Sequence, residues 1–200
     1  MDREITTLPL VTVNSGISTY SPDPDSAFVK ENDPAERVMT DFKKVVPITV
    51  EPIVGIDLAL NKMKTAGVRL LFVTDEQDHI AGVITSYDIQ GEKPVKYSQE
   101  HGISHHLILV EMIMVPLEQI PAFDYDFVQQ SLVRHVIITI QELERPYALV
   151  VEIDSHNGRQ TIRGLFSSSQ ISKLVGKHIY KPLHVANSLA GIQQELVHNQ

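Results

Sequence analysis

One sequence pattern occurs twice in this chain of 200 residues, and the repeat limits the folds that the chain can adopt. In Val68–Ile89, two apolar runs flank a polar turn, and the second run leads to a threonine and, three residues later, an aspartate. Arg145–Ile171 has the same order of features, with a serine and a glutamine in the corresponding places. Apolar runs on both sides of a polar turn are typical of paired strands. A unit that is used twice predicts two similar halves that pack face to face.

The end of the first copy carries the residues with the most specific chemistry. We expect Thr85 to end a strand and to begin a short helix, whose free N–H groups and positive dipole end can hold an anion such as a phosphate. Asp88 offers a carboxylate that can bind the hydroxyls of a ribose. The same two residues also fit a helix capping box, in which each side chain bonds to the backbone of the other. From these residues alone, both interpretations stay open.

The order of motifs along the chain resembles a tandem pair of CBS domains, the nucleotide-sensing modules first named from cystathionine β-synthase. In the first copy these motifs are Arg37–Thr40, Pro47–Val50, Ala59–Leu60, Met63, Gly67–Arg69, Val73–Asp75 and Gly82–Ile89. The second copy, from Val110 to about Gly176, is looser but in register. The resemblance implies an α+β fold, in which two β-α-β-β-α repeats pack about a pseudo-two-fold axis.

We expect the chain to divide into four segments. They are an N-terminal arm (residues 1–32), the first CBS repeat (33–97), a linker with the second CBS repeat (98–178) and a C-terminal amphipathic helix (179–200). Thr6–Val13 is a candidate edge strand of the arm, and a helix that Asp33 caps opens the first repeat. Apolar residues at helical spacing predict helices at Ile56–Ala66 and Leu132–Leu143.

The resemblance also implies a ligand and the residues that bind it. An adenine nucleotide such as AMP, ADP or ATP, or another adenosyl compound, would lie in the cleft between the repeats. The residues implied are Thr85, Asp88 and Ser86 at the helix start, Arg69 as a phosphate contact, and Ile48, Pro47 and Lys44 from the preceding segment. For Arg69 a surface role, and for Lys44 a solvated loop, are the alternatives.

A weaker second site is implied in the second repeat, at Ser167, Tyr147 and Gln170. The amide of Gln170 lacks the ionised carboxylate of Asp88, so this site is expected to be weak, altered or empty. We expect Arg163 to lie on the strand surface rather than in a site.

Composition narrows the possible functions. With 42% hydrophobic residues the chain can bury a core, and its net charge of −8 repels polyanions, so we expect nucleic acid to be a poor general partner. Cysteine is absent, which excludes disulfides and thiolate metal sites. Met1–Glu4 is too polar for a signal peptide, and no apolar run reaches membrane-spanning length, so we expect no membrane partner and a cytoplasmic protein.

The sequence contains no motif that predicts catalysis or a metal site. A phosphate-binding loop, a His-Glu-x-x-His sequence and a Gly-x-Ser-x-Gly elbow are all absent. His101, His105 and His106 could suggest zinc, but no fourth ligand has a suitable spacing, so we expect a solvated linker at residues 91–106. We therefore expect no enzyme and no required cofactor.

Two functional hypotheses follow from these expectations. The favoured one is a regulatory module that binds an adenosine nucleotide, forms a homodimer, and changes the activity of an unknown partner protein by shifting between conformations. The alternative is a scaffold for protein–protein interaction with an empty cleft. Whether adenosine compounds stabilise the protein distinguishes the two hypotheses.

Overall fold

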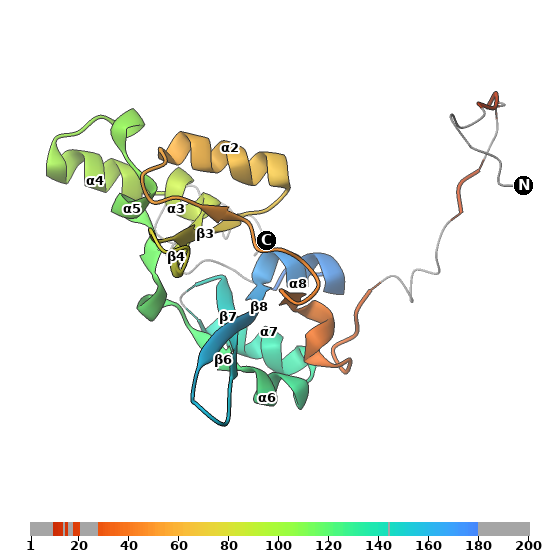
Figure 1. Ribbon diagram of the computed structural model, residues 1–200. Helices are drawn as coiled ribbons and strands as arrows, with labels where there is room; N and C mark the ends of the chain where they lie inside the picture. Colours follow the sequence, from red (N-terminus) through yellow and green to blue (C-terminus); the bar gives the residue numbers. More distant parts are fainter. Residues whose placement is uncertain (1–9, 14, 16–17, 21–27, 144, 180–200) are drawn as a thin grey trace, which may run out of the picture.

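The computed structural model describes residues 10–13, 15, 18–20, 28–143 and 145–179. Two four-stranded sheets form its centre, and helices cover them (Figure 1). Of the expected strand at Thr6–Val13, the described part, residues 10–13, is not a strand. The expected C-terminal helix at residues 179–200 falls, apart from Ile179, outside the described residues.

Each sheet has the same internal pattern, a parallel pair of strands followed by an antiparallel hairpin. In the first sheet β2 (Thr49–Val50) runs parallel to β3 (Leu70–Thr74), which forms a hairpin with β4 (Ile80–Thr85). In the second sheet the corresponding strands are β6 (Ala122–Asp124), β7 (Tyr147–Ile153) and β8 (Gln160–Ser167). Both hairpins carry a register shift in their first strand, between Val73 and Thr74 and between Val150 and Val151. The two expected β-α-β-β-α repeats are therefore confirmed.

The helices of the repeats begin and end where local sequence signals place them. α2 (Ile56–Ala66) ends at Gly67, whose left-handed backbone (φ 68°) suits a residue without a Cβ atom. α3 (Ser86–Gln90) and α8 (Ser168–Val175) follow the two hairpins directly. α6 (Tyr125–Gln129) and α7 (Val133–Glu142) belong to the second repeat, and α7 confirms the helix predicted from apolar spacing.

The segment between the two repeats is more ordered in structure than expected. It contains α4 (Lys93–His101), η2 (His105–Leu107), α5 (Val110–Ile113) and η3 (Leu117–Gln119). Most residues of 91–106 are exposed, as expected of a solvated linker, but much of the segment is helical rather than loose. The ring of His101 stacks on Tyr97 with centroids 4.0 Å apart, and Pro94 is buried.

The two repeats exchange their first strands. β1 (Thr40–Asp41), which precedes the first repeat's sheet, pairs with β8 of the second repeat, and β5 (Val115–Pro116) pairs with β4 of the first. The repeated glycines explain the exchange: a Cβ atom on Gly82 would lie 2.4 Å from the Val115 carbonyl oxygen, and one on Gly164 would lie 2.7 Å from the Thr40 carbonyl oxygen. Each glycine thus provides the space for the incoming strand.

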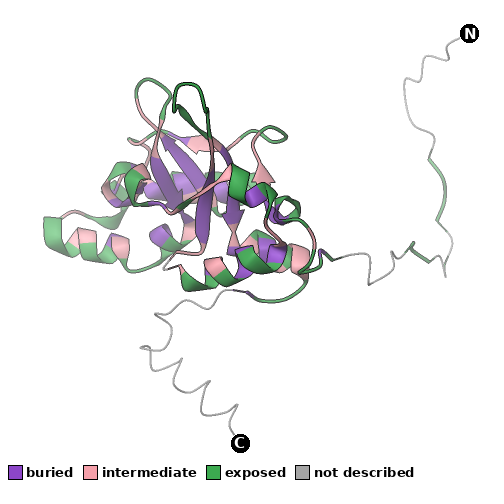
Figure 2. Cartoon of the chain, turned by 90° about the horizontal axis from the view of Figure 1, so that it is seen from below, coloured by how far each residue is buried: buried purple, intermediate pink, exposed green. Residues whose placement is uncertain are grey.

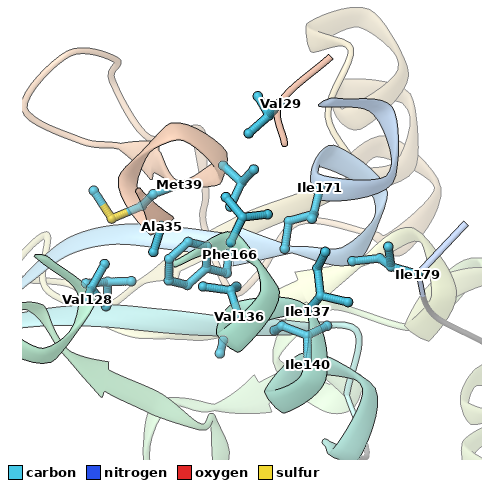
Figure 3. Packing of buried hydrophobic residues seen from close by; sticks show 14 residues of the cluster. Val29, Ala35, Met39, Val128, Val136, Ile137, Ile140, Phe166, Ile171 and Ile179 are labelled. Carbon is cyan, nitrogen blue, oxygen red and sulfur yellow. The ribbon is translucent and has the colours of Figure 1, made fainter. Parts of the chain in front are cut away.

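The N-terminal segment packs into the second repeat. η1 (Ala35–Val38) is a 3-10 turn rather than the capped α-helix expected at Asp33, and the Asp33 carboxylate accepts hydrogen bonds from the Lys30 N–H and from Arg37 instead. Val29, Ala35 and Met39 contribute to a buried cluster with residues of α7, β8 and α8 (Figure 3). The two repeats are therefore interleaved in space. The segments on either side of the boundary expected between residues 97 and 98 contribute strands to the same sheets.

Arg163 corrects another expectation. It is only 8% exposed, forms an ion pair with Asp41, and lies with its guanidinium carbon 4.6 Å from the centre of the Tyr125 ring. This ion pair ties β1 to β8. Arg163 is a buried structural residue and not a surface strand residue.

Another buried cluster joins the two sheets. It is formed by Phe72, Val83, Val115, Ile120, Tyr147, Leu149 and Leu165. Figure 2 shows the strands as the most buried part of the molecule, with the exposed faces of the helices outside them. Within the described residues, no helix combines the length and the apolar character needed to cross a membrane.

Candidate functional site

Residues 85–88, at the end of β4, form a helix cap, which was one of the two interpretations of the sequence. The Thr85 hydroxyl accepts a hydrogen bond from the Asp88 N–H (3.2 Å), and an Asp88 carboxylate oxygen accepts from the Thr85 N–H (2.9 Å) and from the Thr85 hydroxyl (2.6 Å). The other oxygen of Asp88 lies 2.6 Å from the ammonium group of Lys93. Both oxygens of this buried carboxylate therefore have protein partners.

The second repeat forms a simpler version of the same cap. The Ser167 hydroxyl accepts a hydrogen bond from the Gln170 N–H at 3.3 Å, and β8 passes into α8 at this point. The side chain of Gln170 does not complete the box, and it is exposed. The two repeats thus keep the same backbone geometry with different side-chain chemistry.

A cleft of about 660 Å³ lies between the repeats and brings most of the expected residues together. The lining from the first repeat includes Pro47, Ile48, Arg69, Thr85 and Tyr87. From the second repeat it is lined by Pro146, Tyr147, Leu165, Ser167, Ser168, Ser169, Gln170 and Lys173. The residues expected for two separate sites therefore line one shared cleft.

Three expected residues do not line this cleft. Asp88 is held in the capping box, and the Ser86 N–H donates to the carbonyl oxygen of Arg69. Lys44 points outward, with its side chain 80% exposed and its ammonium 3.5 Å from Asp41. A role for these three in ligand binding remains a prediction.

The hydroxyl group of Tyr147 is buried at the cleft without a hydrogen-bond partner among the described residues. Burial raises the pKa of Tyr147 to about 12, and the negative charge of Asp88 adds to the rise, which Arg145 partly offsets. The hydroxyl therefore stays protonated near neutral pH. A buried donor without a partner costs stability.

A second hollow of about 560 Å³ adjoins the cleft along α8. Arg69, Tyr87, Ser168, Ser169 and Lys173 line both spaces, and the second adds Ser172, Gly176, Lys177 and His178. No aspartate or glutamate lines either space, although the chain has 25 acidic and 17 basic residues. The combined site is therefore apolar at one end and cationic at the other.

The residues that the sequence did not identify are the serines of α8 and its lysines. Ser168 and Ser169 follow the predicted cap at Ser167, and Lys173 and Lys177 are four residues apart. Lys173 lies in the last turn of α8, and Lys177 follows Gly176, where the helix ends. Nothing in the sequence shows that these residues and Arg69 line one space, because that space joins the two repeats. In the part of the chain that the structure describes, no three His, Asp or Glu side chains gather in a way that could hold a metal ion.

Two interleaved β-α-β-β-α repeats with a cleft between them are the architecture of a tandem CBS-domain pair. No protein-family model and no curated protein matches the chain. Among solved structures, the chain is similar to an uncharacterized conserved protein from Pyrococcus horikoshii, with 20% identity, 72% of this chain and 92% of that one covered, and a TM-score of 0.49.

Two structures whose descriptions name CBS domains are also similar. A CBS-domain protein from Agrobacterium tumefaciens has 20% identity, with 64% of this chain and 83% of that one covered and a TM-score of 0.46. A CBS-pair protein from Arabidopsis thaliana, solved in complex with AMP, has 17% identity, with 70% of this chain and 94% of that one covered and a TM-score of 0.45. At these identities no ligand or partner carries over to this chain.

Proposed function

We propose that this protein is a regulatory module that binds an adenine nucleotide in the cleft between its two repeats. The observation that carries the proposal is the cleft itself, which has an apolar wall, a cationic end and no carboxylate in its lining. A nucleotide has complementary chemistry, since the two faces of its flat base are apolar and its phosphates are anionic.

The apolar end of the cleft suits the base. Val46, Pro47 and Ile48 approach from the first repeat, and Tyr147 and Leu165 from the second. A ring placed between these side chains would bury its apolar faces against both repeats.

The cationic end suits the phosphate. The Arg69 guanidinium lies 3.4 Å from the Tyr87 hydroxyl, and no carboxylate of a described residue forms an ion pair with it. Ser168 and Ser169 add hydroxyl groups at the start of α8. Arginine and hydroxyl donors without competing carboxylates are the groups that bind phosphate.

A ligand in this position would contact both repeats at once. It would stabilise the arrangement of the repeats that closes on it, and this is a way in which a binding protein can act as a sensor. A partner protein, or a second copy of the chain in a homodimer, would respond to that arrangement.

The test is thermal unfolding of the full chain with adenosine, AMP, ADP, ATP and S-adenosylmethionine. A ligand at about 100 times its Kd stabilises a protein by about 2.7 kcal/mol, so the binding ligand should raise the Tm by several degrees. Arg69→Met should reduce that rise, whereas Lys62→Met, which removes an exposed charge outside the cleft, should not.

Arg69 gives a cleaner test than Asp88. Replacing Asp88 would also break the helix cap and the ion pair with Lys93, so it would lower the Tm of the unliganded protein. If no adenosine compound changes the Tm of the wild-type protein, the nucleotide proposal is wrong and the scaffold with an empty cleft is the better description.

A further inference from the structure

The second hollow beside α8 indicates which class of nucleotide fits. We infer that the ligand carries a chain of two or three phosphates that extends from the cleft into this hollow. The inference rests on the proposed nucleotide site and adds to it the region around Lys177, which lines only the second hollow.

The two spaces share one wall. Arg69, Tyr87, Ser168, Ser169 and Lys173 line both, so the hollow lies directly beside the cationic end of the cleft. The hollow is large enough, at about 560 Å³, for several phosphate groups. A nucleoside monophosphate would not fill the second hollow, which would then contain water.

The charges of the hollow match a polyanion. Arg69 and Lys173 form no ion pair with a carboxylate of the described residues, and His178 adds a ring that can donate a hydrogen bond. Three serines, Ser168, Ser169 and Ser172, supply hydroxyl donors between these groups. A cationic ligand such as S-adenosylmethionine finds no carboxylate for its sulfonium group in either space.

Lys177 is the residue that separates short from long phosphate chains. Its side chain is 53% exposed and forms an ion pair with Glu31 of the N-terminal segment. An exposed ion pair of this kind contributes little to stability, so a terminal phosphate can replace Glu31 as its partner. The exchange would also release Glu31 and so connect ligand binding to the segment around Val29, which packs on α8.

Isothermal titration calorimetry of the full chain with adenosine, AMP, ADP and ATP, without divalent metal, tests this inference. We expect affinity to rise from adenosine to ATP, with ATP at least about tenfold tighter than AMP, since each added phosphate gains charge-assisted hydrogen bonds. Higher salt should reduce the difference.

Variants of Lys177 locate the effect. Lys177→Met should weaken ATP binding by about tenfold and leave AMP binding unchanged, whereas Lys177→Arg, which keeps the charge, should retain the preference for ATP. Lys62→Met, an exposed lysine that lines neither space, is the charge-matched control and should change neither affinity.

The outcomes separate this inference from the proposed function. Equal affinities for AMP and ATP, or a loss at Lys177→Met that is the same for both, would overturn the polyphosphate inference and leave the nucleotide site standing. Absence of binding by every compound would overturn the proposed function and the inference together.

Discussion

At the residue scale, Asp88 takes the role of the helix cap, one of the two interpretations of residues 85–88, and adds an ion pair with Lys93. It completes the helix cap with Thr85 and neutralises Lys93. Asp88→Ala should therefore lower the free energy of unfolding by about 2–4 kcal/mol, because a cap is lost and the ammonium of Lys93 loses its counterion. Urea denaturation followed by circular dichroism measures this change.

The second repeat supplies the matched control for this substitution. Gln170 stands at the position of Asp88, but its side chain is exposed and adds nothing to the Ser167 cap. Gln170→Ala should change the free energy of unfolding by less than about 0.5 kcal/mol. Similar losses in the two variants would show that Asp88 does not stabilise the fold through its side-chain contacts.

At the element scale, the attachment of β1 depends on the buried ion pair between Asp41 and Arg163. Burial alone would raise the pKa of Asp41, but the hydrogen bond from Arg163 outweighs it, together with the Lys43 N–H and the charges of Arg163 and Lys44, so this pKa lies below its usual range. The stabilisation is therefore complete above the unfolded-state pKa of about 3.9 and is lost as the pH falls through the lower, folded-state pKa.

Replacing Asp41 tests this pH dependence. Asp41→Asn should lower the free energy of unfolding near neutral pH by about 2 kcal/mol, because it removes the hydrogen-bonded counterion of the buried Arg163 and leaves only Glu152, whose carboxylate lies 3.6 Å away. The loss should shrink as the pH approaches 3. Stability measured by urea denaturation across the acid range gives both values. Lys96→Met, which breaks an exposed pair with Glu92, should lower stability by at most about 0.5 kcal/mol and leave the acid dependence in place.

The same elements show what the sequence could and could not predict. The hairpins, α2, α7 and both caps were predictable, since each depends on residues within one turn or one hairpin of each other. The exchange of β1 and β5 was not, because the contact between Asp41 and Arg163 joins residues 122 positions apart. A cleft between the repeats was expected, but not that the residues of both expected sites line it together, because the motifs of each repeat indicate a site of its own.

At the scale of the whole molecule, the exchanged strands make the two repeats depend on each other. β5 lies against Gly82, and its Val115 belongs to the buried cluster that joins both sheets. Gly82→Ala would place a Cβ atom 2.4 Å from the Val115 carbonyl oxygen and force the two strands apart. We expect this variant to lower the free energy of unfolding by about 2–4 kcal/mol, in a single transition of the full chain.

Hydrogen exchange shows whether the damage crosses from one repeat to the other. In Gly82→Ala, amide protection should fall in β7 and β8 of the second sheet as much as in β3 and β4, because Leu149 and Leu165 lose the same buried partners. Gly55→Ala is the matched control, since its Cβ atom would meet no atom within 4 Å and its φ of −64° suits alanine. Reduced protection confined to the first sheet would mean that the repeats are energetically independent, and a ligand between them could then not act on both at once.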